Sequence, residues 1–392
     1  MTTWQDRYSA AMMGTLSTPL ALLERGEGCY VWDDAGKQYL DFLSGIAVNS
    51  LGHAHPAIVG AVTTQINALA HVSNYFATVP QIELAERLKR ITGAGDAGRV
   101  YFCNSGAEAN EAAFKLSRLN KGDGSRTRVL ALTDAFHGRT MGALALTGKP
   151  HMREPFEPVA GGVEHIDSTI EALEAAMDHT VAALFLEPIK GEAGVLELPD
   201  GYVARARELC TEFGALLILD EIQTGVGRTG RWFAYEYAGI VPDALTLAKG
   251  LGGGVPIGAL VTFGAASNLF TRGQHGSTYG GNPLVTATSN AVLSVIEDEN
   301  LVDNAERRGA ELRAIIEGFD SPLIDEVRGL GLLIGIGLAE PVALKLAAAA
   351  MDAGLIVNAA NESTIRIAPP LIIGDDEVAE FSRRFGAAIA SL

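Results

Sequence analysis

From about residue 98 onward, short apolar runs alternate with segments that have helical spacing, and this pattern restricts the fold more than any other feature. The apolar runs are RVYFC, RVLALTD, AALFLEP, LLILDE, ALTLAK and IGALVTF; helical segments such as AEANEAAFKLSRL and YVARARELCTEFG stand between them. Continuous apolar strands separated by helices are typical of a mostly parallel sheet that is covered on both faces. We therefore expect an α/β protein with such a sheet at its centre.

The two ends of the chain have a different character. Residues 28–43 alternate apolar and polar around the turn DDAGK, which predicts a hairpin, and residues 55–69 and 80–91 have helical spacing. After Asn282-Pro283 come a long helical stretch over 284–319, a helix from about Pro341 to Ala353, and mixed strands. A chain of 392 residues is longer than one hydrophobic core usually accommodates. We therefore expect a smaller α+β domain formed by both chain ends (1–57 and 285–392) and a large domain over 58–284.

Charge and cysteine content narrow the possible partners and location. The net charge of −17 argues against a surface for nucleic acid and against binding to anionic membranes, since both would repel the protein. Cys29, Cys103 and Cys210 are widely spaced and odd in number, which suggests neither a disulfide framework nor a metal site. We see no signal peptide and no apolar run that is long enough to cross a membrane. These features predict a cytoplasmic location.

Two of the expected strands end in residues that can carry chemistry. Asp220 ends LLILD, and Lys249 follows ALTLA with glycines at 250, 252, 253 and 254 beyond it. Burial disfavours an ammonium and lowers its pKa, which frees the amine to attack carbonyls. An aspartate on a neighbouring strand can hold a proton on a pyridine nitrogen, so the pair matches the two protein groups that pyridoxal phosphate requires. An exposed lysine and a helix-capping aspartate are the structural alternatives.

The segment 103–115 predicts a strand end, a turn and a helix start. The N–H groups and the positive dipole end of such a helix can hold phosphate, which makes Ser105, Gly106 and Ala107 candidate ligands. A capping box between Ser105 and Glu108 explains the same residues without a ligand.

Further candidates lie after an expected strand (Phe136 and Arg139), in a tight loop (Ser277 and Thr278) and within a strand-like segment (Arg366). Phe136 could stack on a pyridine ring, and Arg139 could bind a substrate carboxylate through its planar fork. Ser277 and Thr278 could donate hydroxyls to a phosphate. Arg366 lies among apolar neighbours and therefore requires a partner or a ligand carboxylate. A core phenylalanine, a surface ion pair and ordinary turn residues are the alternatives.

Gly225, Gly227 and Gly230 also satisfy G-x-G-x-x-G, the dinucleotide fingerprint. This pattern is weak on its own, because it carries meaning only between a strand and a helix. Here EIQT separates the strand from the first glycine, and RTGRWFAYEYAG is a poor amphipathic helix. The sequence thus disfavours a nicotinamide-dependent oxidoreductase.

An ordered series of motifs gives the chain a family resemblance. It runs from DFLSGIAVNSLGHAHP through NSGAEANEAA, AFHGRTMGAL, EPIKGEAGV, LILDEIQTGVGRTG, LAKGLGGGVPIGA and HGSTYGGNP to RGLGLLIG and IRIAPPL. The chain resembles the class III (ornithine-type) aminotransferases, which have PLP fold type I. The match covers nearly the whole chain. It implies pyridoxal 5'-phosphate as cofactor and no metal.

The resemblance also implies roles for individual residues. Lys249 would form the Schiff base and carry the proton, and Asp220 would pair with the ring nitrogen. The implied cofactor-binding residues are Ser105, Gly106, Ala107, Phe136, Asp220, Glu221, Ile222, Gln223 and Lys249, with Thr278 from the other subunit of a homodimer. The implied substrate-binding residues are Arg139, Ser277, Glu192 and Arg366, with Glu192 leaving Arg366 when glutamate binds.

The implied reaction moves the δ-amino group of N-acetylornithine to 2-oxoglutarate, a step of arginine biosynthesis. Family members that act on free ornithine carry a tyrosine where this chain has Ile46, which cannot hydrogen-bond a charged α-amine. That disfavours ornithine and leaves succinylornithine, succinyl-diaminopimelate and 4-aminobutyrate as alternatives. An aminomutase, a decarboxylase and a binding-only relative stay open on sequence alone.

Overall fold

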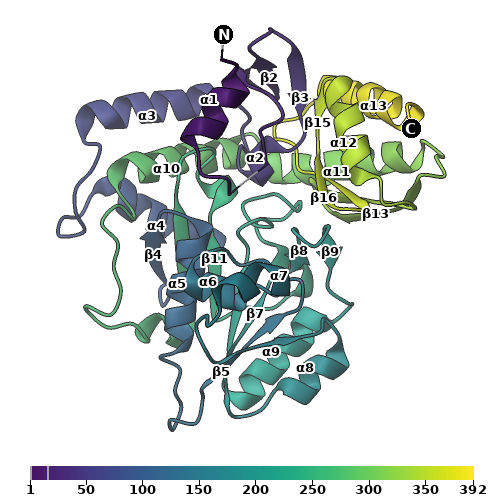
Figure 1. Cartoon of the computed structure of the whole chain (residues 1–392). Coiled ribbons are helices and arrows are strands. Elements are labelled where there is room, and N and C mark those ends of the chain that lie inside the picture. The colour runs from purple at the N-terminus through teal and green to yellow at the C-terminus, as the bar shows by residue number, and fades with distance from the viewer. Residues whose placement is uncertain (1, 16) are drawn as a thin grey trace.

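The centre of the protein is a seven-stranded sheet, in a computed structural model that describes residues 2–15 and 17–392 (Figure 1). Its order is β4 (Arg99–Cys103), β12 (Gly258–Thr262), β11 (Ala244–Leu247), β10 (Leu216–Asp220), β7 (Val181–Leu186), β5 (Arg128–Leu132) and β6 (Val163–Ile166). Strand β12 runs antiparallel to both of its neighbours, and the other pairs are parallel. The expected mostly parallel sheet is confirmed.

Both faces of this sheet are buried, as the continuous apolar strands predict. Along β10, Leu217 and Leu219 join the core cluster that includes residues of α9 (Tyr202–Phe213), while Leu216 and Ile218 join the cluster on α5 (Gly106–Ser117). Because side chains alternate along a strand, Asp220 continues the row that faces α5. This parity fixes the direction of the carboxylate before any polar contact is considered.

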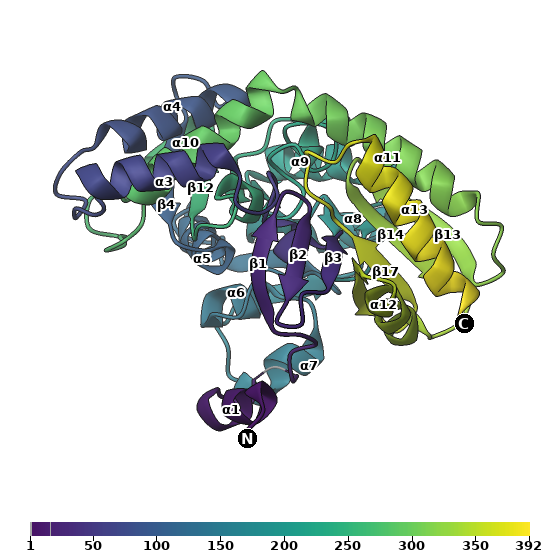
Figure 2. The same ribbon diagram turned by 90° about the horizontal axis from the view of Figure 1, so that it is seen from above.

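Helices surround the sheet and connect its strands (Figure 2). Besides α5 and α9, they are α3 (Pro56–Ala68), α4 (Val79–Ile91), α6 (Met141–Leu146), α7 (Pro150–Arg153) and α8 (Ile170–Ala176), with short 3-10 turns at Glu154–Phe156, Ala234–Ala238, Lys249–Leu251 and Gly264–Asn268. The predicted helices over 55–69 and 80–91 correspond to α3 and α4. A small hairpin, β8 (Ile189–Lys190) and β9 (Leu196–Glu197), follows β7.

The two chain ends meet in one sheet. Near the N-terminus lie α1 (Trp4–Ala11), β1 (Leu23–Glu27), β2 (Tyr30–Asp33), β3 (Gln38–Asp41) and the irregular turn α2 (Ser44–Ala47). Strands β2 and β3 form the predicted hairpin, and β15 (Leu355–Ile356) pairs with β3 in parallel. Figure 1 shows these early strands beside the yellow-green C-terminal elements.

The C-terminal part contains a four-stranded antiparallel sheet and four helices. The sheet order is β13 (Ile324–Leu330), β14 (Leu333–Leu338), β17 (Thr364–Ile367) and β16 (Asn358–Asn361). The helices are α10 (Pro283–Asp298), α11 (Leu301–Glu317), α12 (Ala343–Asp352) and α13 (Asp375–Ala390). The single helical stretch expected over 284–319 is divided, because Asn300 has a φ of 52°, a left-handed conformation that asparagine tolerates and a helix does not continue.

Across the residues that the structure describes, we find no helix both long enough and apolar enough to span a bilayer.

Candidate active site

A cavity of about 550 Å³ opens where the parallel strands end. The segments that follow β4, β5, β7, β10 and β11 all contribute to its wall, as expected for ligand sites at the carboxyl edge of an open α/β sheet. The lining includes most of the sequence-predicted site residues: Ser105, Gly106, Ala107, Phe136, Arg139, Glu192, Asp220, Ile222, Gln223 and Lys249. Sequence positions that are far apart are thus brought to one place.

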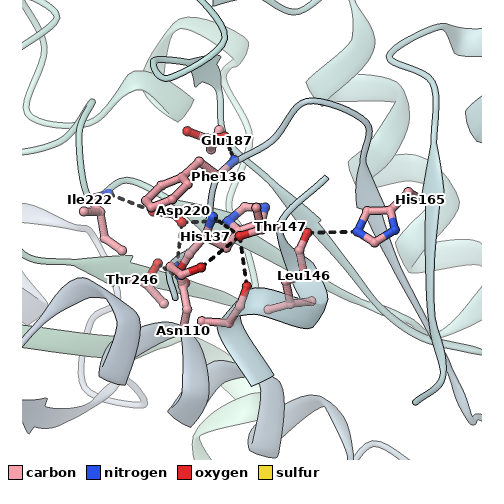
Figure 3. A network of polar contacts seen from close by, with 12 residues as sticks. Asn110, Phe136, His137, Leu146, Thr147, His165, Glu187, Asp220, Ile222 and Thr246 are labelled. Carbon is pink, nitrogen blue, oxygen red and sulfur yellow. Dashed lines mark hydrogen bonds and ion pairs between the residues drawn. The ribbon is translucent and has the colours of Figure 1, made fainter. Parts of the chain in front are cut away.

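Asp220 is the centre of a buried polar network (Figure 3). Its Oδ2 atom lies 2.8 Å from Asn110 Nδ2 and 2.8 Å from His137 Nδ1, and its Oδ1 accepts the Ile222 N–H at 3.1 Å. Asn110 in turn accepts a hydrogen bond from Thr246 Oγ1 at 2.9 Å. The carboxylate is therefore fixed in orientation while it faces the cavity.

His137 is a titratable neighbour of Asp220 in this network, and its pKa is shifted. Burial disfavours its imidazolium, yet the hydrogen bond and charge of Asp220, with the charge of Glu187, outweigh burial and raise the His137 pKa. Its Nε2 atom has no hydrogen-bond partner among the described residues. Asn110, His137 and Thr246 were not predicted; the Asn and His of NEAA and AFHG were visible signals, but their convergence on Asp220 required the fold.

Lys249 follows β11 and lines the same cavity. Burial lowers its pKa to about 8, an effect that the charge of Glu192 opposes. Its backbone has a φ of 37°, which is unusual for a residue with a side chain and is a form of strain often found at functional sites. A fraction of the amine is therefore neutral and nucleophilic near neutral pH.

The N-terminus of α5 points its first turn at the cavity. Ser105 caps the helix by accepting the Glu108 N–H at 3.2 Å. Glu108 does not complete the predicted capping box; its Oε2 instead accepts the backbone N–H of Asn104 at 2.8 Å. A side chain at Gly106 would meet Ile222 Cδ1 at 2.8 Å, so glycine keeps this wall open.

Phe136 and Arg139 lie on the loop after β5. The Phe136 N–H donates to Glu187 Oε2 at 2.8 Å, and the Arg139 guanidinium lies 5.8 Å from the centre of the Phe136 ring. Burial raises the Glu187 pKa to about 7, an effect that the positive charge of His137 opposes. The loop therefore presents one aromatic face and one cation to the cavity.

Arg366 reaches this site from β17. It is only 1% exposed. Its Nη1 contacts Glu192 Oε1 at 2.5 Å and Gln223 Oε1 at 3.2 Å, and its Nη2 donates to Asn358 Oδ1 at 2.8 Å. Burial disfavours the Glu192 carboxylate, but the charge and hydrogen bond of Arg366 outweigh it and hold the Glu192 pKa below its ordinary value. The expected pairing of Glu192 with Arg366 is present.

Four residues that the sequence analysis singled out lie outside the lining of this cavity. Glu221 is buried away from the lining: its carboxylate accepts the Thr224 hydroxyl and the Tyr235 N–H, and burial raises its pKa to about 7. Ser277 accepts a hydrogen bond from Asn104 Nδ2 at 3.2 Å outside the lining, and Thr278 is exposed in the same loop. Ile46 is 40% exposed and also outside the lining, to which Val48 contributes instead.

The glycine fingerprint forms turns. Gly227 and Gly230 have φ values of 85° and 83°, and no helix follows them before the short turn Ala234–Ala238. A side chain at Gly230 would meet Glu306 of α11 at 2.8 Å. These glycines serve close packing between segments and do not begin a dinucleotide-binding helix.

Comparisons with known proteins agree with this geometry. The family profile "Aminotransferase class-III" matches residues 12–389. Acetylornithine aminotransferase from Mycobacterium tuberculosis (strain ATCC 25618 / H37Rv) is 54% identical over 380 residues, covering 97% of this chain and 94% of the relative. Among solved structures, N-acetylornithine aminotransferase from Stenotrophomonas maltophilia K279a has a TM-score of 0.83 at 37% identity, covering 95% of this chain and 96% of that one. The ornithine aminotransferase from Toxoplasma gondii, solved with partial occupancy of PLP at its active site, has a TM-score of 0.93 at 33% identity, covering 99% and 95%.

Proposed function

Because the chain belongs to the class-III aminotransferase family, we propose that it transfers the δ-amino group of N2-acetyl-L-ornithine to 2-oxoglutarate. The products are N-acetyl-L-glutamate 5-semialdehyde and L-glutamate, and the reaction serves arginine biosynthesis. The observation that carries this proposal is a single cavity in which Lys249 and Asp220 accompany two arginines, Arg139 in the wall and Arg366 behind Glu192. The relatives that bear the name acetylornithine aminotransferase support the substrate.

The residues present fit pyridoxal 5'-phosphate, the cofactor of this family. The first N–H groups of α5, at Gly106 and Ala107, begin a helix of 12 residues whose positive end suits a phosphate. The missing side chain of Gly106 leaves space beside Ile222. Phe136 offers an aromatic face, and Asp220 offers an oriented carboxylate. Of the further residues assigned to the cofactor, Gln223 lines the cavity, and Glu221 acts through the turn that it anchors.

When bound, the cofactor supplies a carbonyl that accepts amines and a pyridine ring that takes up electron density. Asp220, which Asn110 and His137 orient, would hold the proton on the ring nitrogen. The Lys249 Nζ atom, whose pKa is lowered to about 8 by burial, would take the proton from the carbon that bears the reacting amine and would return it as a general acid. Lys249 thus acts as both nucleophile and proton carrier.

Two arginines separate the two substrates. We assign Arg139, with Ser277 nearby, to the α-carboxylate of acetylornithine, because that carboxylate lies far from the reacting δ-amine. We assign Arg366 to the α-carboxylate of glutamate and 2-oxoglutarate, with Glu192 as its partner when the acylated substrate is bound. Each assignment uses the planar guanidinium fork, which matches a carboxylate.

The protein acts as a homodimer with shared sites in this proposal. Large apolar side chains are exposed on α3, on α4, on the loop between them and on the loop of Thr278: Val59, Ile66, Tyr75, Phe76, Val79, Ile82 and Tyr279. Large exposed apolar patches mark protein interfaces, and these side chains are the candidates for such a patch. Thr278 lies outside the lining of its own chain's cavity, which supports an assignment to the phosphate bound by the partner subunit.

We also propose a cytoplasmic location and a division of the chain into three segments. Cys29, Cys103 and Cys210 are buried free thiols, a state that reducing compartments maintain. The strands of the central sheet lie within 58–284, whereas β15 from the segment 285–392 pairs with β3 from 1–57. This pairing supports a small domain built from both ends.

Separate half-reactions test the proposed function. Acetylornithine alone should bleach the visible absorbance of the purified holoenzyme, and 2-oxoglutarate should restore it. The same bleaching assay is run with four alternative amino donors: succinylornithine, succinyl-diaminopimelate, ornithine and 4-aminobutyrate. Arg139→Ala should lower kcat/KM for acetylornithine by a factor that corresponds to roughly 2–5 kcal/mol, because a charge-assisted pair is lost. Arg231→Ala is the control, since Arg231 is another arginine near an aromatic ring, and it should leave kcat/KM unchanged. Bleaching by 4-aminobutyrate in preference to acetylornithine would reject the substrate assignment.

A further inference from the structure

Glu192 stands between two cavities. On one side it lines the site described above; on the other it lines a second cavity of about 300 Å³. Lys149, Asp134 and Asn361 also line the second cavity. The Glu192 side chain is 29% exposed, whereas its partner Arg366 is almost completely buried. Of the two partners, Glu192 is therefore the one with space to move.

Lys149 holds the backbone at this point. Its Nζ atom donates to the Glu192 carbonyl oxygen at 2.7 Å. Within residues 2–15 and 17–392, Lys149 forms no ion pair with a carboxylate. Its charge is among those that lower the Glu192 pKa, after the larger effects of Arg366 and Lys249. A cation that no described carboxylate neutralises thus lies beside Glu192, in the wall of the second cavity.

The proposed function requires Glu192 to leave Arg366. Both terminal nitrogens of Arg366 are already occupied, by Glu192 and Gln223 on one and by Asn358 on the other. Glu192 must therefore withdraw before a glutamate carboxylate can take the Nη1 atom of Arg366 and, with the Nε atom that has no partner among the described residues, the rest of the guanidinium. A carboxylate that loses its cation in a partly buried place is destabilised unless it finds another partner.

We propose that Lys149 is this second partner. On binding of 2-oxoglutarate or glutamate, the Glu192 carboxylate turns from Arg366 into the second cavity and pairs with the Lys149 ammonium. Lys149 is thereby a positioning residue, which acts through Glu192 and makes Arg366 available for one of the two substrates. This inference rests on the proposed function and adds the residue that controls the exchange of substrates.

Asp134 supplies an opposing charge. It lines the same cavity as Lys149 and Glu192, so its carboxylate repels an incoming Glu192 and makes the Lys149 cation necessary. Asp134 has a φ of 62°, a conformation that asparagine also adopts readily. Asp134→Asn is therefore a variant that removes the repulsion with little backbone strain.

The test measures each half-reaction separately in single turnovers of the holoenzyme. Lys149→Gln should weaken apparent binding of 2-oxoglutarate by about twofold to fivefold, the scale of one partly exposed ion pair, and should leave the acetylornithine half-reaction unchanged. Lys149→Arg should behave as wild type, and Asp134→Asn should tighten 2-oxoglutarate binding. Lys37→Gln is the matched control, because Lys37 also donates to backbone carbonyls, those of Met351 and Asp352, far from the site.

A double-mutant cycle separates this role from a structural one. In a Glu192→Gln background, residue 192 has no carboxylate for Lys149 to pair with. Lys149→Gln should therefore have no further effect on the binding of 2-oxoglutarate. Equal losses in both half-reactions, or the same loss in the Glu192→Gln background, would overturn the inference. If wild-type enzyme lacks the acetylornithine half-reaction, the proposed function fails instead, and the response of the glutamate half-reaction to Lys149→Gln still decides the role of Lys149.

Discussion

At the scale of single residues, the neighbours of Asp220 decide how it meets the cofactor. Asn110 and His137 both contact its Oδ2 atom, and the parity of β10 directs the carboxylate toward α5. The hydrogen bond and charge of Asp220 and the charge of Glu187, acting against burial, raise the His137 pKa. An imidazolium at this position would pair with the Asp220 carboxylate and keep it oriented.

His137→Phe tests this support. The variant should lower kcat by roughly tenfold to a hundredfold, the range for losing one buried hydrogen bond to a charged group, while KM for acetylornithine changes little. Steady-state kinetics provide the measurement. His165→Phe is the control, since His165 is a half-buried histidine that contacts the Leu146 carbonyl rather than Asp220. Equal loss in both variants would mean that His137 serves packing alone.

Glu221 carries a second prediction, on the pH dependence of stability. Burial raises its pKa from 4.5 to about 7. Between these values the folded protein holds a proton that the unfolded chain releases, so stability falls as the pH rises through this window. Glu221→Gln cannot ionise and should escape the loss.

Urea unfolding of the apoenzyme at about pH 5 and about pH 8 measures this loss. Between the two pH values, the unfolding free energy of the wild type should fall relative to that of Glu221→Gln by up to about 3 kcal/mol. Glu340→Gln, at an exposed site, is the control and should leave the pH dependence unaltered. A wild-type minus Glu221→Gln difference that stays constant with pH contradicts a neutral buried Glu221.

At the scale of elements, the N-terminus of α5 is the part of the cavity that is built to receive an anion. Ala107→Asp places a carboxylate in its first turn. Acidic groups there stabilise a helix, so the apoprotein should stay folded. The same charge repels phosphate, and we expect cofactor affinity to fall by at least about tenfold, measured by absorbance titration with pyridoxal phosphate.

Leu344→Asp is the matched control. It adds the same charge to the first turn of α12, which has no acidic residue there and does not line the cavity. Its cofactor affinity should equal that of the wild type. If Ala107→Asp binds the cofactor normally, the phosphate lies elsewhere.

Sequence patterns predicted most of the elements, for physical reasons. Continuous apolar runs identified the buried strands, and Asp220 and Lys249 could be placed at one edge because parallel strands share it. The break at Asn300 was missed, since helical periodicity continues across it. The contacts of Asn110, His137 and Thr246 depend on which face of each strand meets α5, and spacing along the chain cannot specify that.

At the scale of the whole molecule, the proposed shared sites allow complementation between inactive subunits. Lys249→Ala and Thr278→Lys should each be poorly active as homodimers. Co-expressed with different tags and purified as the mixed dimer, they should form one intact site, with Lys249 from one subunit and Thr278 from the other. We expect about half of the wild-type activity per dimer, measured as turnover.

Mixed dimers of Lys249→Ala with Lys249→Ala carrying the second tag are the control and should be inactive. A mixed Lys249→Ala and Thr278→Lys dimer with no recovered activity would show that Thr278 does not serve the partner's site. The same preparation, analysed by sedimentation, checks that the assembly is a dimer.

The central claim is that Lys249 is the residue that binds pyridoxal phosphate covalently. The most direct measurement is borohydride reduction of the purified holoenzyme, followed by peptide mapping with mass spectrometry. We predict one modified peptide, with the pyridoxyl phosphate adduct on Lys249, and none in Lys249→Ala. An adduct on another lysine, or a wild-type protein that takes up no cofactor, would contradict the account.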